Sequence, residues 1–252
     1  MHQTSNMASL SHEFFPNSPI ILSIIQFRYD KIEALDYKKL MEIGKTINST
    51  YPSIKEQFTR NLDIKELEVT SVTLGDKITN GVVFLSKDNK QSITINEEKF
   101  TFQKHGNYNG WDDFIKDFKD NWEVFNSVLG IETLKGLSVR VVNRFNLPMN
   151  IKSPEEYFTT FINTNSGTLS IGNFQFKYTA RDASKNMHWN IAHSLERAID
   201  NKITYIFDID VLINENIPND KNLIWEKFNL IREKKNSIFN DGITEKTKTL
   251  VR

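Results

Sequence analysis

Two aspartates have the spacing that metal chemistry on a β-sheet requires. Asp208 and Asp210 lie two residues apart in the strand-like stretch 203–213, so both carboxylates point to the same face of that strand. A pair of this kind could hold Mg²⁺, as in metal-dependent nucleases. The alternative is that both belong to the polar face of a half-buried strand.

Two arginines show the same spacing rule on another predicted strand. Arg140 and Arg144 share one face of the stretch 137–147. If this strand neighbours the one that carries the aspartates, the four side chains form a cross-strand charge ladder. We favour this ion pairing over a metal site, because no third acidic ligand is suitably spaced. We therefore assign no metal ligand and no catalytic residue.

A third candidate surface is aromatic. Phe174, Phe176 and Tyr178 alternate with polar residues, and on an exposed sheet face they could stack single-stranded bases. Under a covering helix the same residues form core, which is the interpretation that we favour. The balance of 32 Lys+Arg against 32 Asp+Glu also disfavours a general polyanion binder. These three residues and the four charged ones are thus candidates for binding, with nucleic acid as a less favoured partner.

Other reactive groups are scarce. The absence of cysteine excludes disulfides, thiol nucleophiles and cysteine-ligated metals. No phosphate-binding glycine loop, dinucleotide fingerprint or G-x-S-x-G elbow occurs, so we expect no cofactor. His188 and His193 are five residues apart and would face opposite sides of one strand. The basic run 232–235 is typical of a solvated helix face.

The elements that position these residues follow from apolar periodicity and from turn residues. Strand-like stretches are 20–29, 64–73, 81–86, 92–96 and 99–105 in the first half, and 137–147, 174–181, 187–195 and 203–213 in the second. Turns are expected at 75–76, 87–90 and 97–98. Predicted helices cover 36–47, 111–129, a start at 153–156 that leads into Tyr157 and Phe158, and a final long helix capped by Asn219 or Asp220.

This order predicts an α+β fold, with a mainly antiparallel sheet and long covering helices. It resembles a duplicated helix-grip unit, β-α-β(3-4)-α, as in the TATA-binding-protein fold, although no residue-level repeat supports it. We expect a flexible leader at 1–18, two α+β halves at 19–131 and 132–241, and a polar tail at 242–252. Neither a signal peptide nor an apolar membrane span is seen, so we expect a cytoplasmic protein without membrane contact.

Four segments resemble motifs of a sporadically distributed, uncharacterised bacterial family. Residues 15–28 are similar to its N-P-P-I start and following R-F pair, with Ser18 in place of the first proline. Residues 136–145, 206–211 and 225–244 are similar to its central strand, a late D-x-D strand and its C-terminal motif. No activity is established for the family, so the resemblance implies a genomic setting, that of mobile anti-phage or toxin–antitoxin-like genes, and no reaction.

These observations favour a non-catalytic cytoplasmic recognition or accessory protein, with a protein partner encoded nearby and the open sheet face as its binding surface. The resemblance implies that it belongs to such a module. The alternative is a metal-dependent nuclease or nucleotide-processing enzyme that uses Asp208 and Asp210. A further alternative is a small-ligand sensor, because a sheet gripped by a long helix can leave a pocket between them.

Overall fold

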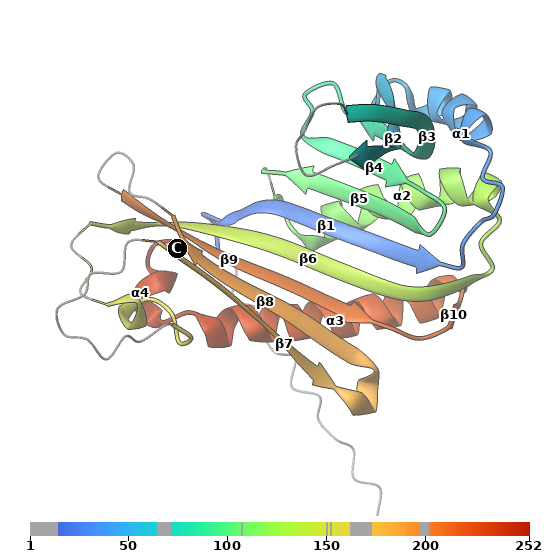
Figure 1. Ribbon diagram of the computed structural model, residues 1–252. Coiled ribbons are helices and arrows are strands. Elements are labelled where there is room, and N and C mark those ends of the chain that lie inside the picture. Colours follow the sequence, from blue (N-terminus) through green and yellow to red (C-terminus); the bar gives the residue numbers. More distant parts are fainter. Residues whose placement is uncertain are drawn as a thin grey trace, which may run out of the picture.

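In the part of the chain that the structure describes, one antiparallel sheet of ten strands organises the molecule (Figure 1). The computed structural model describes residues 15–64, 72–106, 108–149, 151, 153–161, 173–196 and 202–252. The strands are β1 (Ile20–Tyr29), β2 (Ser53–Ile64), β3 (Val72–Leu85), β4 (Gln91–Ile95), β5 (Lys99–His105), β6 (Thr133–Pro148), β7 (Phe174–Asp182), β8 (Met187–Leu195), β9 (Lys202–Ile213) and β10 (Ile217–Pro218). The helices are α1 (Tyr37–Gly44), α2 (Trp111–Leu129), α3 (Lys221–Gly242) and α4 (Glu245–Lys248), with 3₁₀ turns η1 (Lys45–Ile47), η2 (Pro154–Glu156) and η3 (Ala183–Lys185).

The strand order confirms the predicted α+β class with a mainly antiparallel sheet. Strands follow one another as β2-β3-β4-β5-β1-β6-β9-β8-β7, and β10 pairs with β6. β1, the first strand of the first half, lies beside β5, which precedes the long helix α2 in the chain. β6, the first strand of the second half, lies beside β9, which precedes the short strand β10. The pairing of β1 with β6 makes the regions 19–131 and 132–241 two halves of one continuous sheet. The duplication itself stays a prediction.

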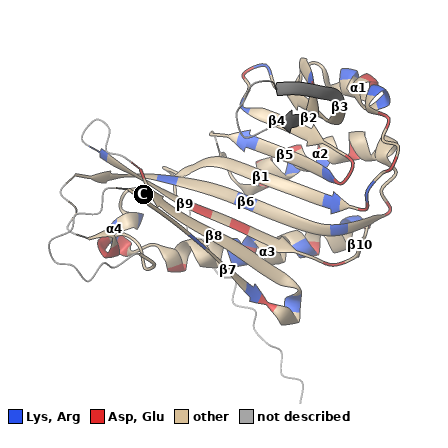
Figure 2. Ribbon diagram, viewed as in Figure 1, with Lys and Arg blue, Asp and Glu red and all other residues tan. Residues whose placement is uncertain are grey.

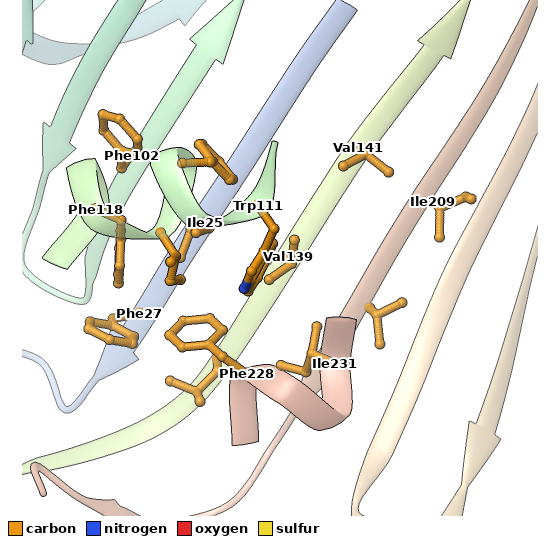
Figure 3. Packing of buried hydrophobic residues seen from close by; sticks show 14 of the residues in the cluster. Ile25, Phe27, Phe102, Trp111, Phe118, Val139, Val141, Ile209, Phe228 and Ile231 are labelled. Carbon is orange, nitrogen blue, oxygen red and sulfur yellow. The ribbon is translucent and has the colours of Figure 1, made fainter. Parts of the chain in front are cut away.

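Two long helices cover one face of this sheet. The buried side chains of α2 recur every three to four residues, as expected for an amphipathic helix, and the helix ends at Gly130, whose φ of 62° suits glycine. Phe118 of α2 and Phe228 of α3 both pack on Phe27 of β1, with ring centroids 4.8 and 5.6 Å away (Figure 3). One core therefore joins the two halves. Within the described residues, no helix has both the length and the apolar character needed to cross a membrane.

The helix starts agree with the predicted caps. Asp36 accepts a hydrogen bond from the backbone N–H of Lys39 at 3.0 Å, and Asp220 accepts one from that of Leu223 at 3.0 Å. Each carboxylate satisfies a backbone donor that has no partner within its helix. Leu223, which the apolar pattern places inward, is instead 42% exposed.

The largest difference from the predicted strands occurs before residue 75. β2 begins at Ser53, whereas the sequence predicted a strand at 64–73, part of which lies outside the described residues. The turn predicted at 75–76 lies within β3. Residues 55–58 of β2 are all exposed, because β2 is an edge strand. Backbone pairing with β3, rather than an apolar face, holds it in the sheet.

The helix predicted from 153 is only the short turn η2. After it, Phe158 forms an isolated β-bridge with Ile243, and its ring stacks on Tyr205 with a centroid distance of 3.7 Å. Tertiary pairing thus outweighs the local helix signal at this point.

The two ends of the described chain meet each other. Asn17 donates from its backbone N–H to the carbonyl of Val251 at 3.1 Å, and its side-chain amide donates to the carbonyl of Arg252 at 2.7 Å. The predicted polar tail contains α4 and the buried Val251. Of the predicted leader, residues 1–14 lie outside the described residues, and Phe15 packs edge-on against Phe239 at 5.7 Å.

Candidate functional site

The predicted arginines and aspartates lie on the sheet face opposite the long helices. Arg140 pairs in register with Asp210, yet its guanidinium turns diagonally to Asp208. The Nε–Oδ1 and Nη2–Oδ2 distances are 2.9 and 2.5 Å, which is the bidentate geometry of a strong charged pair. Figure 2 shows the acidic residues of β9 beside the basic residues of β6. The structure therefore brings Arg140 and Asp208 together as a charge pair.

The other two charged candidates do not join this pair. Asp210 accepts a long hydrogen bond from Asn190 at 3.5 Å, and burial raises the pKa of its carboxyl. Arg144 is exposed and lies opposite Ile206 in the register. Among the described residues, no three histidines, aspartates or glutamates are grouped closely enough to hold a metal ion. This geometry favours ion pairing over a magnesium site.

A double-mutant cycle tests that interpretation. We expect Arg140→Met and Asp208→Asn to show a coupling free energy of about 1 kcal/mol in urea unfolding, because the pair is bidentate but half exposed. We also expect the melting temperature of the wild type to be the same with and without Mg²⁺. A magnesium-dependent rise that disappears in Asp208→Asn would contradict the ion-pair interpretation and favour the nuclease alternative.

The aromatic candidates lie on the opposite, helix-covered face. Phe174 and Phe176 are half-buried, and Tyr178 at the edge of the helix cover is 38% exposed. The ring of Phe176 stacks on His193 with centroids 4.7 Å apart, and His193 stacks in turn on Phe207 at 4.6 Å. The three candidates are therefore part of an aromatic stack that continues into the core, and they do not share a face with Arg140 and Asp208.

A cavity lies under α3, where the small-ligand alternative expects a pocket, but the sequence predicted none of its lining residues. Its volume is about 610 Å³, and four segments contribute to its lining: the chain before and at the start of β1, residues 108–112 at the start of α2, Val141 and Asn143 of β6, and one face of α3. The α3 residues that line it are Arg232, Lys235, Asn236, Phe239 and Asn240. Their spacing of three and four residues places them on a single stripe of the helix.

The most unusual lining group is Lys235. This residue is only 7% exposed, and it forms no hydrogen bond or ion pair with any described residue. Burial, with the charge of Arg232 as a second cause, lowers the pKa of this lysine to about 8. The guanidinium of Arg232 lies over the ring of Trp111, 5.4 Å from its centroid. The cavity wall thus carries two neighbouring cations.

Polar and aromatic groups complete the wall. The Oδ1 atom of Asn240 is buried without a hydrogen-bond partner. Asn143 is 1% exposed and donates to the carbonyl of Phe207 at 2.9 Å, which fixes its amide at the cavity edge. Burial raises the pKa of Tyr108 to about 12, so its hydroxyl stays protonated and can donate. The wall therefore offers donors, an acceptor and apolar rings to a bound molecule.

One sequence signal could have revealed this site. The buried stripe of α3 runs Ile224, Phe228, Ile231, Lys235 and Ile238, so a lysine occupies a position that the periodicity assigns to the core. The composition of the run 232–235 is typical of a solvated helix face, but its last residue, Lys235, is buried.

A comparison of the sequence with protein-family models and with curated proteins finds no match. The resemblance to a sporadic bacterial family consequently stays a prediction, and the function is argued from this geometry alone.

Proposed function

We propose that this protein is a non-catalytic recognition protein that binds a small molecule in the cavity between α3 and the sheet. One observation carries the proposal: a cavity of about 610 Å³ contains the buried Lys235, whose ammonium lacks a partner among the described residues. Binding sites for small molecules have volumes of about 300–1,000 Å³ and combine apolar walls with a few polar groups. A buried charge without a partner is costly, and a ligand would offset that cost.

The lining supports binding more than catalysis. Among the described lining residues, no hydroxyl is hydrogen-bonded to a histidine, lysine or carboxylate, which is the pairing that activates a nucleophile. The Ser18 hydroxyl accepts a hydrogen bond from the backbone N–H of Ile20 at 3.4 Å and shapes the segment before β1. The cavity residues are placed to hold and orient a molecule.

The protein partner expected from the sequence belongs to the same proposal. A ligand under α3 would act as a signal that the protein passes on, in a mobile defence or toxin–antitoxin-like module. Co-purification of a stoichiometric partner from the native host supports this part, and isolation only as a lone monomer contradicts it.

Thermal stability tests the cavity directly. We expect a metabolite that binds the cavity to raise the free energy of unfolding by about 2.7 kcal/mol at a concentration of about 100 times its Kd. Asn236→Phe places a ring in the cavity wall and should abolish that rise. Asn229→Phe makes the same change at an exposed position of α3 and should retain it. A rise that persists in Asn236→Phe would show that the metabolite binds elsewhere.

A further inference from the structure

The position of Lys235 is the starting point for identifying the class of ligand. This residue occupies the buried stripe of α3 between Ile231 and Ile238. A lysine chain at such a position normally extends its ammonium to water, but here the residue is 7% exposed and lines the cavity. Lys235 thus belongs both to the buried stripe of α3 and to the cavity wall.

Other lysines of the same helix have found partners. Lys221 forms an ion pair with Glu123 at 2.5 Å, and Lys227 forms one with Glu215 at 2.5 Å. Lys234 lies over the ring of Trp189, 4.0 Å from its centroid. Lys235 is buried more deeply than any of these and yet has no anion among the described residues.

The charges around the cavity favour an anion. Arg232 and Lys235 contribute two cations, and Asp112 is the only carboxylate among the described lining residues. The N-terminus of α2 adds a partial positive charge, and its N-cap residue, Gly110, lines the cavity and has no side chain that could cap the helix. Asp112, in the first turn, offsets part of that charge, and the two cations of α3 leave the wall positive.

We propose that the cavity binds an organic anion, whose phosphate or carboxylate group lies between Lys235 and Arg232 and whose apolar body packs against Phe15 and Phe239. This inference rests on the proposed function and specifies the ligand class. Both chemical groups accept hydrogen bonds from an ammonium and a guanidinium. Phe15 and Phe239, with rings 5.7 Å apart, belong to the apolar part of the wall.

Binding of an anion should depend on the charge of Lys235. The titratable and charged groups that line the cavity with it are Arg232 on α3, Asp112 on α2, and Tyr108 before α2. Burial and Arg232 bring the pKa of Lys235 to about 8 in the empty protein, and a bound anion favours the charged form. Affinity for an anion should therefore be highest well below pH 8 and fall as the pH rises through 8.

Two fluorescent probes that differ in a single charged group test the proposal. Anilinonaphthalene sulfonate carries a sulfonate on the same aromatic body as the neutral N-phenylnaphthylamine. We expect the anionic probe to bind the full chain about tenfold or more tightly than the neutral one. We expect its affinity, and not that of the neutral probe, to fall as the pH rises above about 8.

Three single variants test whether the cations of the cavity wall bind the anionic probe. Lys235→Met keeps an apolar chain of similar length in the core stripe, so it should fold, lose about tenfold in affinity for the anionic probe and leave the neutral probe unaffected. Arg232→Met should weaken the anionic probe in the same way. Lys234→Met removes a charge outside the cavity lining and should change neither affinity.

The outcomes separate this inference from the proposed function. If both probes bind equally, lose binding in Asn236→Phe and are unaffected by Lys235→Met, the cavity binds ligands but the anion proposal is wrong. If neither probe binds, the proposed function fails as well. If phenyl phosphate displaces the anionic probe and benzoate does not, the ligand carries a phosphate. If benzoate displaces it and phenyl phosphate does not, the ligand carries a carboxylate. If only the uncharged benzyl alcohol displaces it, the proposal is overturned.

Discussion

Truncation of Phe118 to alanine is expected to lower the free energy of unfolding by about 3–5 kcal/mol. This ring is fully buried, and its centroid lies 4.8 Å from that of Phe27, 5.8 Å from that of Phe100 and 5.7 Å from that of Phe228. Alanine would leave a cavity where α2, α3 and the central strand meet, and those elements could close it only in part. Urea unfolding followed by circular dichroism measures the loss.

Because Phe118 contacts α3 as well as the first half of the sheet, the loss should appear in one cooperative transition. Leu223→Ala removes an apolar side chain that is 42% exposed and should change stability by less than about 0.5 kcal/mol. Two separate transitions in Phe118→Ala would contradict a single core. A loss below about 1 kcal/mol would contradict the central place of this ring.

We expect the free energy of unfolding to decrease as the pH is lowered, because of His193. The imidazole is 1% exposed and stacks between Phe176 and Phe207. Its Nδ1 atom lies 2.9 Å from the Tyr205 hydroxyl, and its Nε2 atom is buried without a partner. Burial lowers the pKa of His193 to about 4, since a proton would place an imidazolium in an apolar stack.

The direction of the pH effect follows from the difference in pKa. The unfolded chain binds a proton at its ordinary pKa of 6.5, and the folded chain does so only near 4. The contribution of His193 is thus fully present above pH 6.5 and is lost as the pH falls from 6.5 to 4. Between pH 7 and pH 5, this single group should remove about 2 kcal/mol of stability.

A variant without the imidazole isolates this contribution from those of the carboxylates. His193→Phe combined with Tyr205→Phe keeps the aromatic stack and removes the hydroxyl that would lose its partner. Urea unfolding at pH 5, 6 and 7 should show about 2 kcal/mol less acid loss in this variant than in the wild type. Tyr205→Phe alone retains His193 and should keep the wild-type slope. Equal slopes in the wild type and the double variant would show that His193 is protonated without cost.

Several elements could be predicted because their signals are local. The stripe of α2 and its stop at Gly130 depend on residues within one helix, as do the caps Asp36 and Asp220. The antiparallel class follows from the order of short strands. β2 was placed too late in the chain because its residues 55–58 are exposed and lack an apolar alternation. Its identity depends on backbone pairing with β3.

The charged candidates were only partly predictable. The spacing of Arg140 and Asp208 within their own strands gives the face on which each side chain lies. Which arginine meets which aspartate depends on the register of β6 on β9, and there the pair is diagonal, with Asp210 left to Asn190. A shift of register by two residues would have changed the partners without changing either face.

Local periodicity by itself therefore determined α1, α2 and α3, most strands, the sheet class and the face of each candidate residue, because all of these depend on neighbours a few positions away. Only the tertiary structure decided the partners of Arg140 and Asp208 and the existence of the cavity around Lys235. The residues that line that cavity come from the segments 15–20, 108–112, 141–143 and 232–240, which are distant in the chain and meet only when the sheet and both long helices have packed. The burial of Lys235 results from that packing. In the sequence, the only sign of it is a lysine at a position that the apolar spacing of α3 assigns to the core.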